Sequence, residues 1–160
     1  MKHLQSFKMA ALFIFDESII PKNSNLCKFE FDGDKIKNIE ELNQELIRIM
    51  RFPSYFNGNF NSLEECLNDL SWISDDCDFE IKILHFHSFL INESEDVLIT
   101  FFEILKDIDL NYHRYENDHK RQSLYIVLEK TSKAINLLKK IDVDNVPCSA
   151  NNAEKTKNMG

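Results

Sequence analysis

Short apolar segments alternate with amphipathic segments of helical period along this chain, and this pattern restricts its fold more than any other feature. Strands alternating with helices favour a parallel sheet joined by right-handed crossovers. The sequence therefore predicts an α/β fold, and its 160 residues are expected to form one domain. The strand-like segments are residues 7–15, 28–31, 79–86 and 123–129, and the helix-like segments are 38–50, 61–70, 92 or 94 to 109, and 131–141.

The starts of two of these helices carry the spacing of a capping box. Asn38 precedes Glu41 by three residues, and Asn61 precedes Glu64 by the same interval. We therefore expect Asn38 and Asn61 to be the N-caps. The apolar positions predict two buried faces, made of Ile39, Leu42, Leu46, Ile47 and Met50 in the first helix and of Leu63, Cys66, Leu67 and Leu70 in the second.

The segment between these two helices is rich in aromatic side chains. Pro53 ends the first helix, and Gly58 permits a turn before the second begins. The second helix would then carry Asn61, Glu65 and Asp69 on one outward-facing ridge, beside the aromatic loop 52–60. A row of carboxylates next to aromatic rings suits a surface that binds a basic partner.

The acidic side chains are concentrated in the middle of the chain. The net charge is −8, yet residues 59–110 contain thirteen acidic and two basic side chains, a net charge of −11. Residues 1–58 are neutral overall and residues 111–160 carry +3. Such a surface repels nucleic acid and attracts a basic protein, although acids spread over the surface for solubility are the simpler alternative.

The N-terminal segment resembles a signal peptide only superficially. Lys2 and Lys8 precede the apolar run Met9–Phe15, but Asp16 and Glu17 follow it directly without a small-residue cleavage pattern. The run is also too short to span a bilayer. We therefore expect a buried strand here and a cytoplasmic protein that has no membrane or nucleic-acid partner.

The four cysteines do not suggest a disulfide framework. They are irregularly spaced, without a CxxC pair, at positions Cys27, Cys66, Cys77 and Cys148. In a chain of this size the pattern predicts reduced thiols. Cys66 is expected to be a small buried hydrophobic residue on its helix.

A set of short motifs, in this order along the chain, resembles the barstar family of ribonuclease inhibitors. Residues 28–129 carry the resemblance, whereas the N-terminal 27 residues, the 111–121 connection and the C-terminal extension lie outside it. The motifs are Phe29-Glu-Phe-Asp-Gly-Asp34, Ile39-Glu-Glu-Leu42, Pro53-x-Tyr55-Phe56-x-Gly58-Asn59, Leu63-x-x-Cys66-Leu67, Val97-Leu98-x-x-Phe101-x-Glu103 and the closing strand Ser123–Leu128.

The resemblance implies a fold, a domain organisation and an activity. The fold is a small parallel sheet of three strands packed with four to five helices, to which the apolar N-terminal segment is expected to add one strand. The resemblance places a barstar-like domain over 28–141 after an N-terminal extension over 1–27, and the composition of residues 142–160, rich in Asn, Lys and small residues, predicts a disordered tail. The activity is inhibition of a cytotoxic ribonuclease toxin by one-to-one occlusion of its active site, without catalysis, cofactor or metal, by a protein that is monomeric when free.

The family's inhibitory surface is its second helix with the preceding loop, supported by an acid on the next long helix. The loop tyrosine corresponds to Tyr55, the principal helix acid to Glu65 and the supporting glutamate to Glu103. The full set of predicted partner-binding residues is Tyr55, Phe56, Asn59, Asn61, Glu64, Glu65, Asn68, Asp69 and Glu103.

This chain departs from the family pattern at several of these positions. Asn61 replaces an aspartate, and Glu64 and Leu70 replace tryptophans. Phe56 stands where a second tyrosine is usual, and the loop glycine is displaced by one position to Gly58. The target is therefore open: a ribonuclease other than the family's best-known one, another basic partner, or a non-ribonuclease toxin.

An enzymatic alternative rests on two histidines. If the strand 79–86 continued, His85 and His87 would lie on one face in the manner of two metal ligands, and a small hydrolase could use them with Cys66. No third ligand of matching spacing is visible, and two such histidines usually pack or face solvent. The basic stretch from His113 to Arg121 could contact an anion, although a solvated loop is the simpler interpretation.

Overall fold

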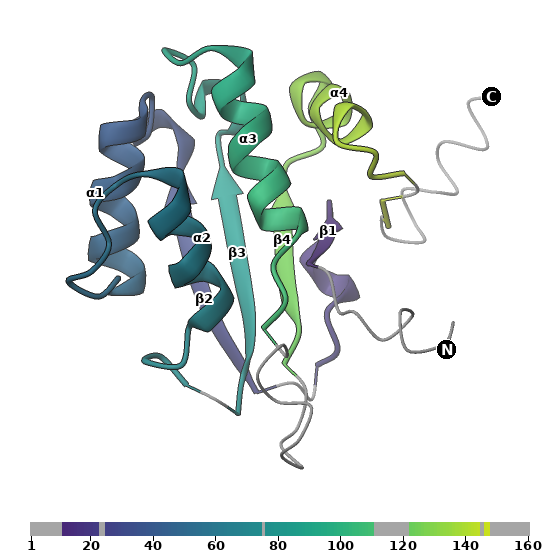
Figure 1. Cartoon of the computed structure of the whole chain (residues 1–160). Coiled ribbons are helices and arrows are strands. Elements are labelled where there is room, and N and C mark those ends of the chain that lie inside the picture. The colour runs from purple at the N-terminus through teal and green to yellow at the C-terminus, as the bar shows by residue number, and fades with distance from the viewer. Residues whose placement is uncertain (1–10, 23–24, 75, 111–121, 145, 148–160) are drawn as a thin grey trace, which may run out of the picture.

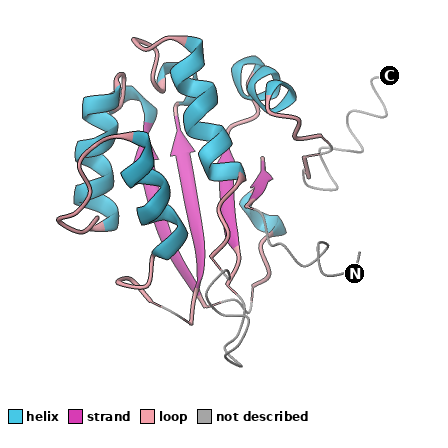
Figure 2. Cartoon of the chain, viewed as in Figure 1, coloured by secondary structure: helices cyan, strands magenta, loops and turns pink. Residues whose placement is uncertain are grey.

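The computed structural model describes residues 11–22, 25–74, 76–110, 122–144 and 146–147. It confirms the expected α/β fold, with a four-stranded parallel sheet and four α-helices (Figures 1 and 2). The elements are β1 (Leu12–Ile14), η2 (Glu17–Ile19), β2 (Leu26–Asp32), η3 (Gly33–Lys35), α1 (Ile39–Met50), α2 (Phe60–Asp69), β3 (Asp78–Leu84), η4 (Phe86–Ser88), α3 (Glu95–Lys106), β4 (Leu124–Leu128) and α4 (Ser132–Lys140), where η denotes a short 3₁₀ helix.

The strand order explains why the helices share one layer. The sheet runs β1-β4-β3-β2, and every neighbouring pair is parallel. The chain moves from β2 to β3 to β4 in one direction, so right-handed crossovers place the connecting helices on the same face. Figure 1 shows α1, α2, α3 and α4 side by side over that face, with α1 at the β2 edge. One face of the molecule is thus lined by the outer surfaces of helices.

The main core lies between this helical layer and the sheet. Alternate strand residues point into it, as the period of two requires, and they include Phe31, Phe79 and Ile126. The predicted face of α2 is confirmed, since Leu63, Cys66, Leu67 and Leu70 are all buried. In α3, Phe101 and Phe102 add two adjacent rings whose centroids lie 5.3 Å apart.

The opposite face of the sheet has a smaller apolar cluster, made by Ile14, Ile20 and Val127. The connection from β1 to β2 contributes Ile20, and Glu17 of η2 forms an ion pair with Lys82 at 3.2 Å. The N-terminal strand thus extends the sheet by pairing with β4, which confirms the expected fourth strand. It is shorter than the predicted segment 7–15, of which residues 7–10 lie outside the described residues.

One predicted core residue of α1 is exposed. Asn38 caps the helix as expected, accepting the Glu41 backbone N–H at 2.9 Å, and Leu42, Leu46 and Met50 are buried. The prediction for Ile47 was wrong, because this side chain is 48% exposed. Because α1 lies at the edge of the helical layer (Figure 1), only a narrow stripe of the helix faces the core.

Several predicted features fall partly outside the described structure. The connection 111–121, and residues 145 and 148–160 of the expected tail, lie outside the described residues. At the start of that tail, Val143 and Val146 pack on the core, and the Phe15 N–H donates to the Pro147 carbonyl at 3.3 Å. Where the chain is described, its helices are too short or too polar to traverse a bilayer.

Candidate functional site

The loop before α2 determines where that helix begins. Asn57 Oδ1 accepts hydrogen bonds from the Asn59 N–H at 3.1 Å and the Ser62 hydroxyl at 2.8 Å. Asn59 Oδ1 accepts the Ser62 N–H at 2.8 Å, which makes Asn59 the N-cap. Gly58 supplies the turn with a φ of +89°, a left-handed conformation that suits glycine.

The predicted N-cap of α2, Asn61, was therefore wrong by two residues. Asn61 is the second residue of the helix, because the preceding polar loop already satisfies the first free backbone donors. The earlier start leaves the predicted outer ridge intact. Asn61, Glu65 and Asp69 are all exposed.

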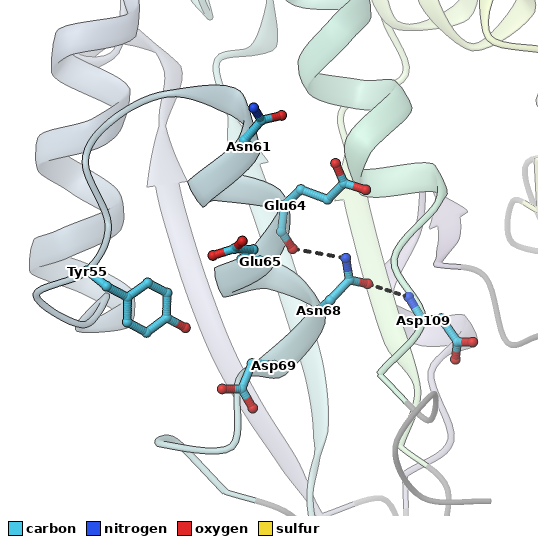
Figure 3. Close-up of a pocket in the computed structure, with 7 residues that line it drawn as sticks. All are labelled: Tyr55, Asn61, Glu64, Glu65, Asn68, Asp69 and Asp109. Atoms are coloured by element: carbon cyan, nitrogen blue, oxygen red, sulfur yellow. Dashed lines mark hydrogen bonds between the residues drawn. The ribbon is translucent and has the colours of Figure 1, made fainter.

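An open surface cavity of about 810 Å³ lies over the exposed side of α2. Figure 3 shows Tyr55, Glu65 and Asp69 on one flank of the helix and Glu64 and Asp109 on the other. This surface, which we call the acidic face, is lined by Tyr55, Asn61, Glu64, Glu65, Asn68, Asp69 and Asp109.

Tyr55 is held against α2 although its ring is half exposed. Its hydroxyl lies close to the Cys66 thiol, and 49% of the residue surface remains accessible. Partial burial of the hydroxyl, with smaller contributions from Cys66, Asp69 and Glu65, raises the pKa of Tyr55 to about 12. The phenol therefore remains neutral, and its ring is fixed beside two carboxylates.

Phe56, the neighbour of Tyr55, turns inward. It is 9% exposed and packs edge-on against Phe52, whose centroid lies 4.9 Å away. Phe52 also packs against Trp72, whose indole N–H donates to the Met50 carbonyl at 2.9 Å. These rings support the loop from below, so the aromatic residue it presents on the acidic face is Tyr55.

Asn68 links the acidic face to the segment that follows α3. Its Nδ2 donates to the Glu64 carbonyl at 2.9 Å, and its Oδ1 accepts the Asp109 N–H at 2.8 Å (Figure 3). These two bonds hold the backbone of Asp109 beside α2. Asp109 was absent from the predicted set, and the predicted third helix continued to residue 109, whereas α3 ends at Lys106 and the segment after it turns toward α2.

The structure thus brings together six of the nine predicted partner-binding residues. Of the remaining three, Phe56 supports the loop and Asn59 caps the helix, whereas Glu103 is exposed on α3 but does not line the cavity. Four carboxylates, those of Glu64, Glu65, Asp69 and Asp109, line the acidic face without a lysine, arginine or histidine among its described lining residues. Such a surface favours cationic groups.

The two histidines of the enzymatic alternative do not share a strand face. β3 ends at Leu84, and His85 has a φ of +51°, which turns the chain into η4. The only group of three potential metal ligands among the described residues is Asp32, Asp34 and His85, and it contains neither His87 nor Cys66. The described residues therefore do not bring together the side chains that the enzymatic alternative requires.

An ion pair accounts for the position of His85. Its Nδ1 lies 2.8 Å from Asp32 Oδ1 and 3.4 Å from Asp34 Oδ2. The hydrogen bond to Asp32, with the charge of Asp34, raises the pKa of His85, and the same bond lowers the pKa of Asp32. The pair holds η3 against η4, where Gly33 has no room for a side chain because a Cβ would lie 2.3 Å from the His85 carbonyl oxygen.

Comparison with known proteins agrees with this geometry. The family model described as Barstar (barnase inhibitor) matches residues 27–129, which include the acidic face, β3, β4 and all of β2 except Leu26. No curated protein matches the chain.

Proposed function

The chain belongs to the barstar (barnase inhibitor) family, and we propose that it inhibits a cytotoxic ribonuclease by binding over its active site. The observation that carries the proposal is the acidic face, and the motif resemblance assigns the family's inhibitory surface to the same helix and the loop before it. In this role it acts as an immunity protein in the cytoplasm of the cell that makes the toxin, in a one-to-one complex.

The chemistry of the target explains why such an inhibitor is acidic. A ribonuclease binds a phosphodiester, so its active site presents clustered arginine, lysine and histidine side chains. Carboxylates placed where the phosphate oxygens would lie form charge-assisted hydrogen bonds with these groups, often in bidentate geometry with arginine. The inhibitor needs position and charge but no catalytic group of its own.

Glu65 is the residue that we assign as the principal phosphate mimic. It is exposed on α2 beside Tyr55, and glutamate reaches one methylene farther than the aspartate usual in the family. Its partner cation should therefore be recessed slightly deeper in the nuclease. In the barnase–barstar complex, close charge pairs couple by roughly 1.5–7 kcal/mol, which sets the scale for such a contact.

The remaining substitutions redistribute the charge of the acidic face. Asn61 contributes a neutral hydrogen bond, worth about 0.5–1.5 kcal/mol, where an aspartate would contribute about 1.5–3 kcal/mol. Glu64 and Asp69 add carboxylates on the two flanks of the helix. We propose that these differences match the inhibitor to a nuclease other than barnase.

The test is a titration of the full chain against the ribonuclease domain encoded beside its gene, with barnase as a second target, while RNA cleavage is followed. We expect stoichiometric loss of activity with the cognate nuclease. A Glu65→Ala variant should bind at least tenfold more weakly, a loss of about 1.4 kcal/mol. Asp144→Ala, an exposed acid distant in sequence, is the matched control and should inhibit like the parent.

Two outcomes would reject parts of this proposal. Undiminished cleavage at molar excess would exclude inhibition of that nuclease. Equal effects of the Glu65 and Asp144 substitutions would exclude the assigned surface. If the chain binds the adjacent toxin without affecting RNA cleavage, the second candidate is supported, in which the acidic face binds another basic partner. The substitutions at Asn61, Glu64 and Leu70 are the observation that favours this candidate.

A further inference from the structure

Two cysteines far apart in the sequence have their thiols in contact. Cys27 Sγ lies 2.8 Å from Cys77 Sγ, although fifty positions separate the two residues. Cys27 lies near the start of β2, and Cys77 is the residue before β3. Both are free thiols in this structure.

The parallel pairing of β2 with β3 places these thiols together. Leu26 is paired with Asp78, and the Asp78 N–H donates to the Asn25 carbonyl at 2.8 Å. Cys27 therefore directly follows one residue of this strand pair, and Cys77 directly precedes the other. Both cysteine side chains pack on the main core beneath the helices. The Cys77 carbonyl also accepts the Gln122 side-chain amide at 2.7 Å, which fixes the residue from the β4 side.

We propose that Cys27 and Cys77 form a reversible disulfide in this protein. A disulfide requires the sulfur atoms to approach by about 0.8 Å from the observed distance, to about 2.05 Å. A change of that size is within reach of side-chain rotation at Cys27, which is only partly buried. The other described cysteine, Cys66, is fully buried on α2 and lies close to the Tyr55 hydroxyl.

Oxidised glutathione serves as the oxidant, and the reaction balances in two exchange steps. The Cys27 thiolate attacks one glutathione sulfur, which breaks the glutathione disulfide and releases one reduced glutathione. Cys77 then attacks the sulfur of Cys27 in the mixed disulfide and releases the second glutathione. Two electrons and two protons pass from the protein thiols to glutathione. Cys27 is the entry point because Cys77 is 3% exposed.

The uncatalysed reaction is expected to be slow at neutral pH. Burial, with the Cys77 thiol and Asp76 nearby, raises the pKa of Cys27 to about 11, so little thiolate is present. Reduction of the bond by glutathione is also expected to be slow, because a thiol with a high pKa is a poor leaving group. Equilibrium measurements at mildly alkaline pH are therefore the suitable test.

The bond would enclose every residue of the acidic face except Asp109 in a covalent loop. Residues 27–77 contain α1, the aromatic loop and the whole of α2. Cross-linking the ends of a loop of this length restricts the unfolded chain, and the expected gain is a rise in Tm of about 10 °C. The disulfide would thus stabilise the elements that form the acidic face without touching its surface.

The experiment equilibrates the full chain with a series of oxidised-to-reduced glutathione ratios at pH 8.5. Each sample is quenched with acid, alkylated, digested with trypsin and Asp-N, and analysed by mass spectrometry, because cleavage before Asp76 separates Cys77 from Cys66. We expect a bridged Cys27–Cys77 peptide at oxidising ratios that disappears after dithiothreitol. The oxidised protein should melt about 10 °C higher.

The variants separate this bridge from others. Cys27→Ala should lose both the bridged peptide and the dependence of Tm on oxidant, whereas Cys148→Ala should retain both. Alkylated Cys27 and Cys77 at the most oxidising ratio would overturn the proposal. A bridge from Cys27 or Cys77 to Cys66 or Cys148 would also overturn it. The peptide map of the parent protein detects such a bridge without any variant.

Discussion

The Asn68 side chain connects α2 to the segment after α3 by hydrogen bonds within the acidic face. We predicted it as a partner contact, and the structure gives both ends of its amide internal partners, the Glu64 carbonyl and the Asp109 N–H. Nothing in the sequence pattern connects residues that lie 41 positions apart. The predicted partner-binding set included Asn68, but only the tertiary structure shows what its amide bonds.

Removing the Asn68 amide should loosen the segment at Asp109. An Asn68→Ala variant loses two hydrogen bonds, and we expect the free energy of unfolding to fall by about 1–2 kcal/mol. The Asp109 amide should also exchange its hydrogen faster. Urea unfolding and hydrogen exchange followed by NMR measure the two effects. Asn136→Ala, on the exposed side of α4, should change stability by less than about 0.5 kcal/mol; unchanged exchange at Asp109 would contradict the assigned bond.

At the scale of elements, the sequence spacing and the hydrogen bonds of the preceding loop indicate different N-cap residues for α2. The spacing to Glu64 predicted Asn61 as the cap, although another asparagine, Asn59, stands two residues earlier in the chain. The hydrogen bonds of Asn57 with Asn59 and Ser62 favour the earlier one. A capping motif indicates that a helix begins nearby, whereas the fold of the preceding loop selects the residue.

The two asparagines should therefore respond differently to substitution. Asn59→Ala removes the cap and should cost about 1 kcal/mol of unfolding free energy. Asn61→Ala changes an exposed residue within the helix and should leave stability nearly unchanged. Thermal or urea unfolding of the two variants compares them directly. A larger loss for Asn61→Ala would show that the helix begins two residues later than observed.

The ion pair between η3 and η4 predicts a defined pH dependence. The raised pKa of His85 means that its contribution is complete below the ordinary value of 6.5 and is lost as the pH rises through the raised value. The lowered pKa of Asp32 means that its contribution is complete above 3.8 and is lost as the pH falls through the lowered value. The pair should stabilise the fold most between about pH 4 and 6.5.

A His85→Asn variant tests this window, because asparagine tolerates the left-handed backbone at this position. The stability difference from the parent should be largest near pH 5 and smaller at pH 8.5, as measured by urea unfolding at each pH. His87→Asn, two residues away, is the matched control and should show a difference that changes less with pH. A parent-to-variant difference at His85 that is constant from pH 5 to 8.5 would contradict the assigned pair.

For the whole molecule, the concentration of acids on one layer sets the expected mode of association. All four cavity-lining carboxylates lie within residues 59–110, the part of the chain with a net charge of −11. A field of one sign on one surface steers an oppositely charged partner and raises the association rate. We propose that the whole domain, residues 28–141, serves to present this layer.

Binding to a basic ribonuclease should therefore be strongly salt-dependent. Raising NaCl from 50 to 500 mM should lower the association rate constant at least tenfold, because the screening length falls from above 10 Å to below it. The dissociation rate should change much less. Stopped-flow fluorescence measures both constants. An association rate independent of salt would show that steering by the acidic layer is unimportant.

The sequence by itself determined the fold class, the order of the elements and the outward ridge of α2, because these follow from periodicity within single segments. Hydrophobic period and caps act between residues a few positions apart, and such local interactions are visible in a linear chain. The tertiary structure alone decided which distant residues meet: Asp109 beside Asn68, His85 beside Asp32, and Cys27 beside Cys77. These contacts depend on strand register and on the packing of one helical layer on the sheet, and no single segment of sequence specifies them.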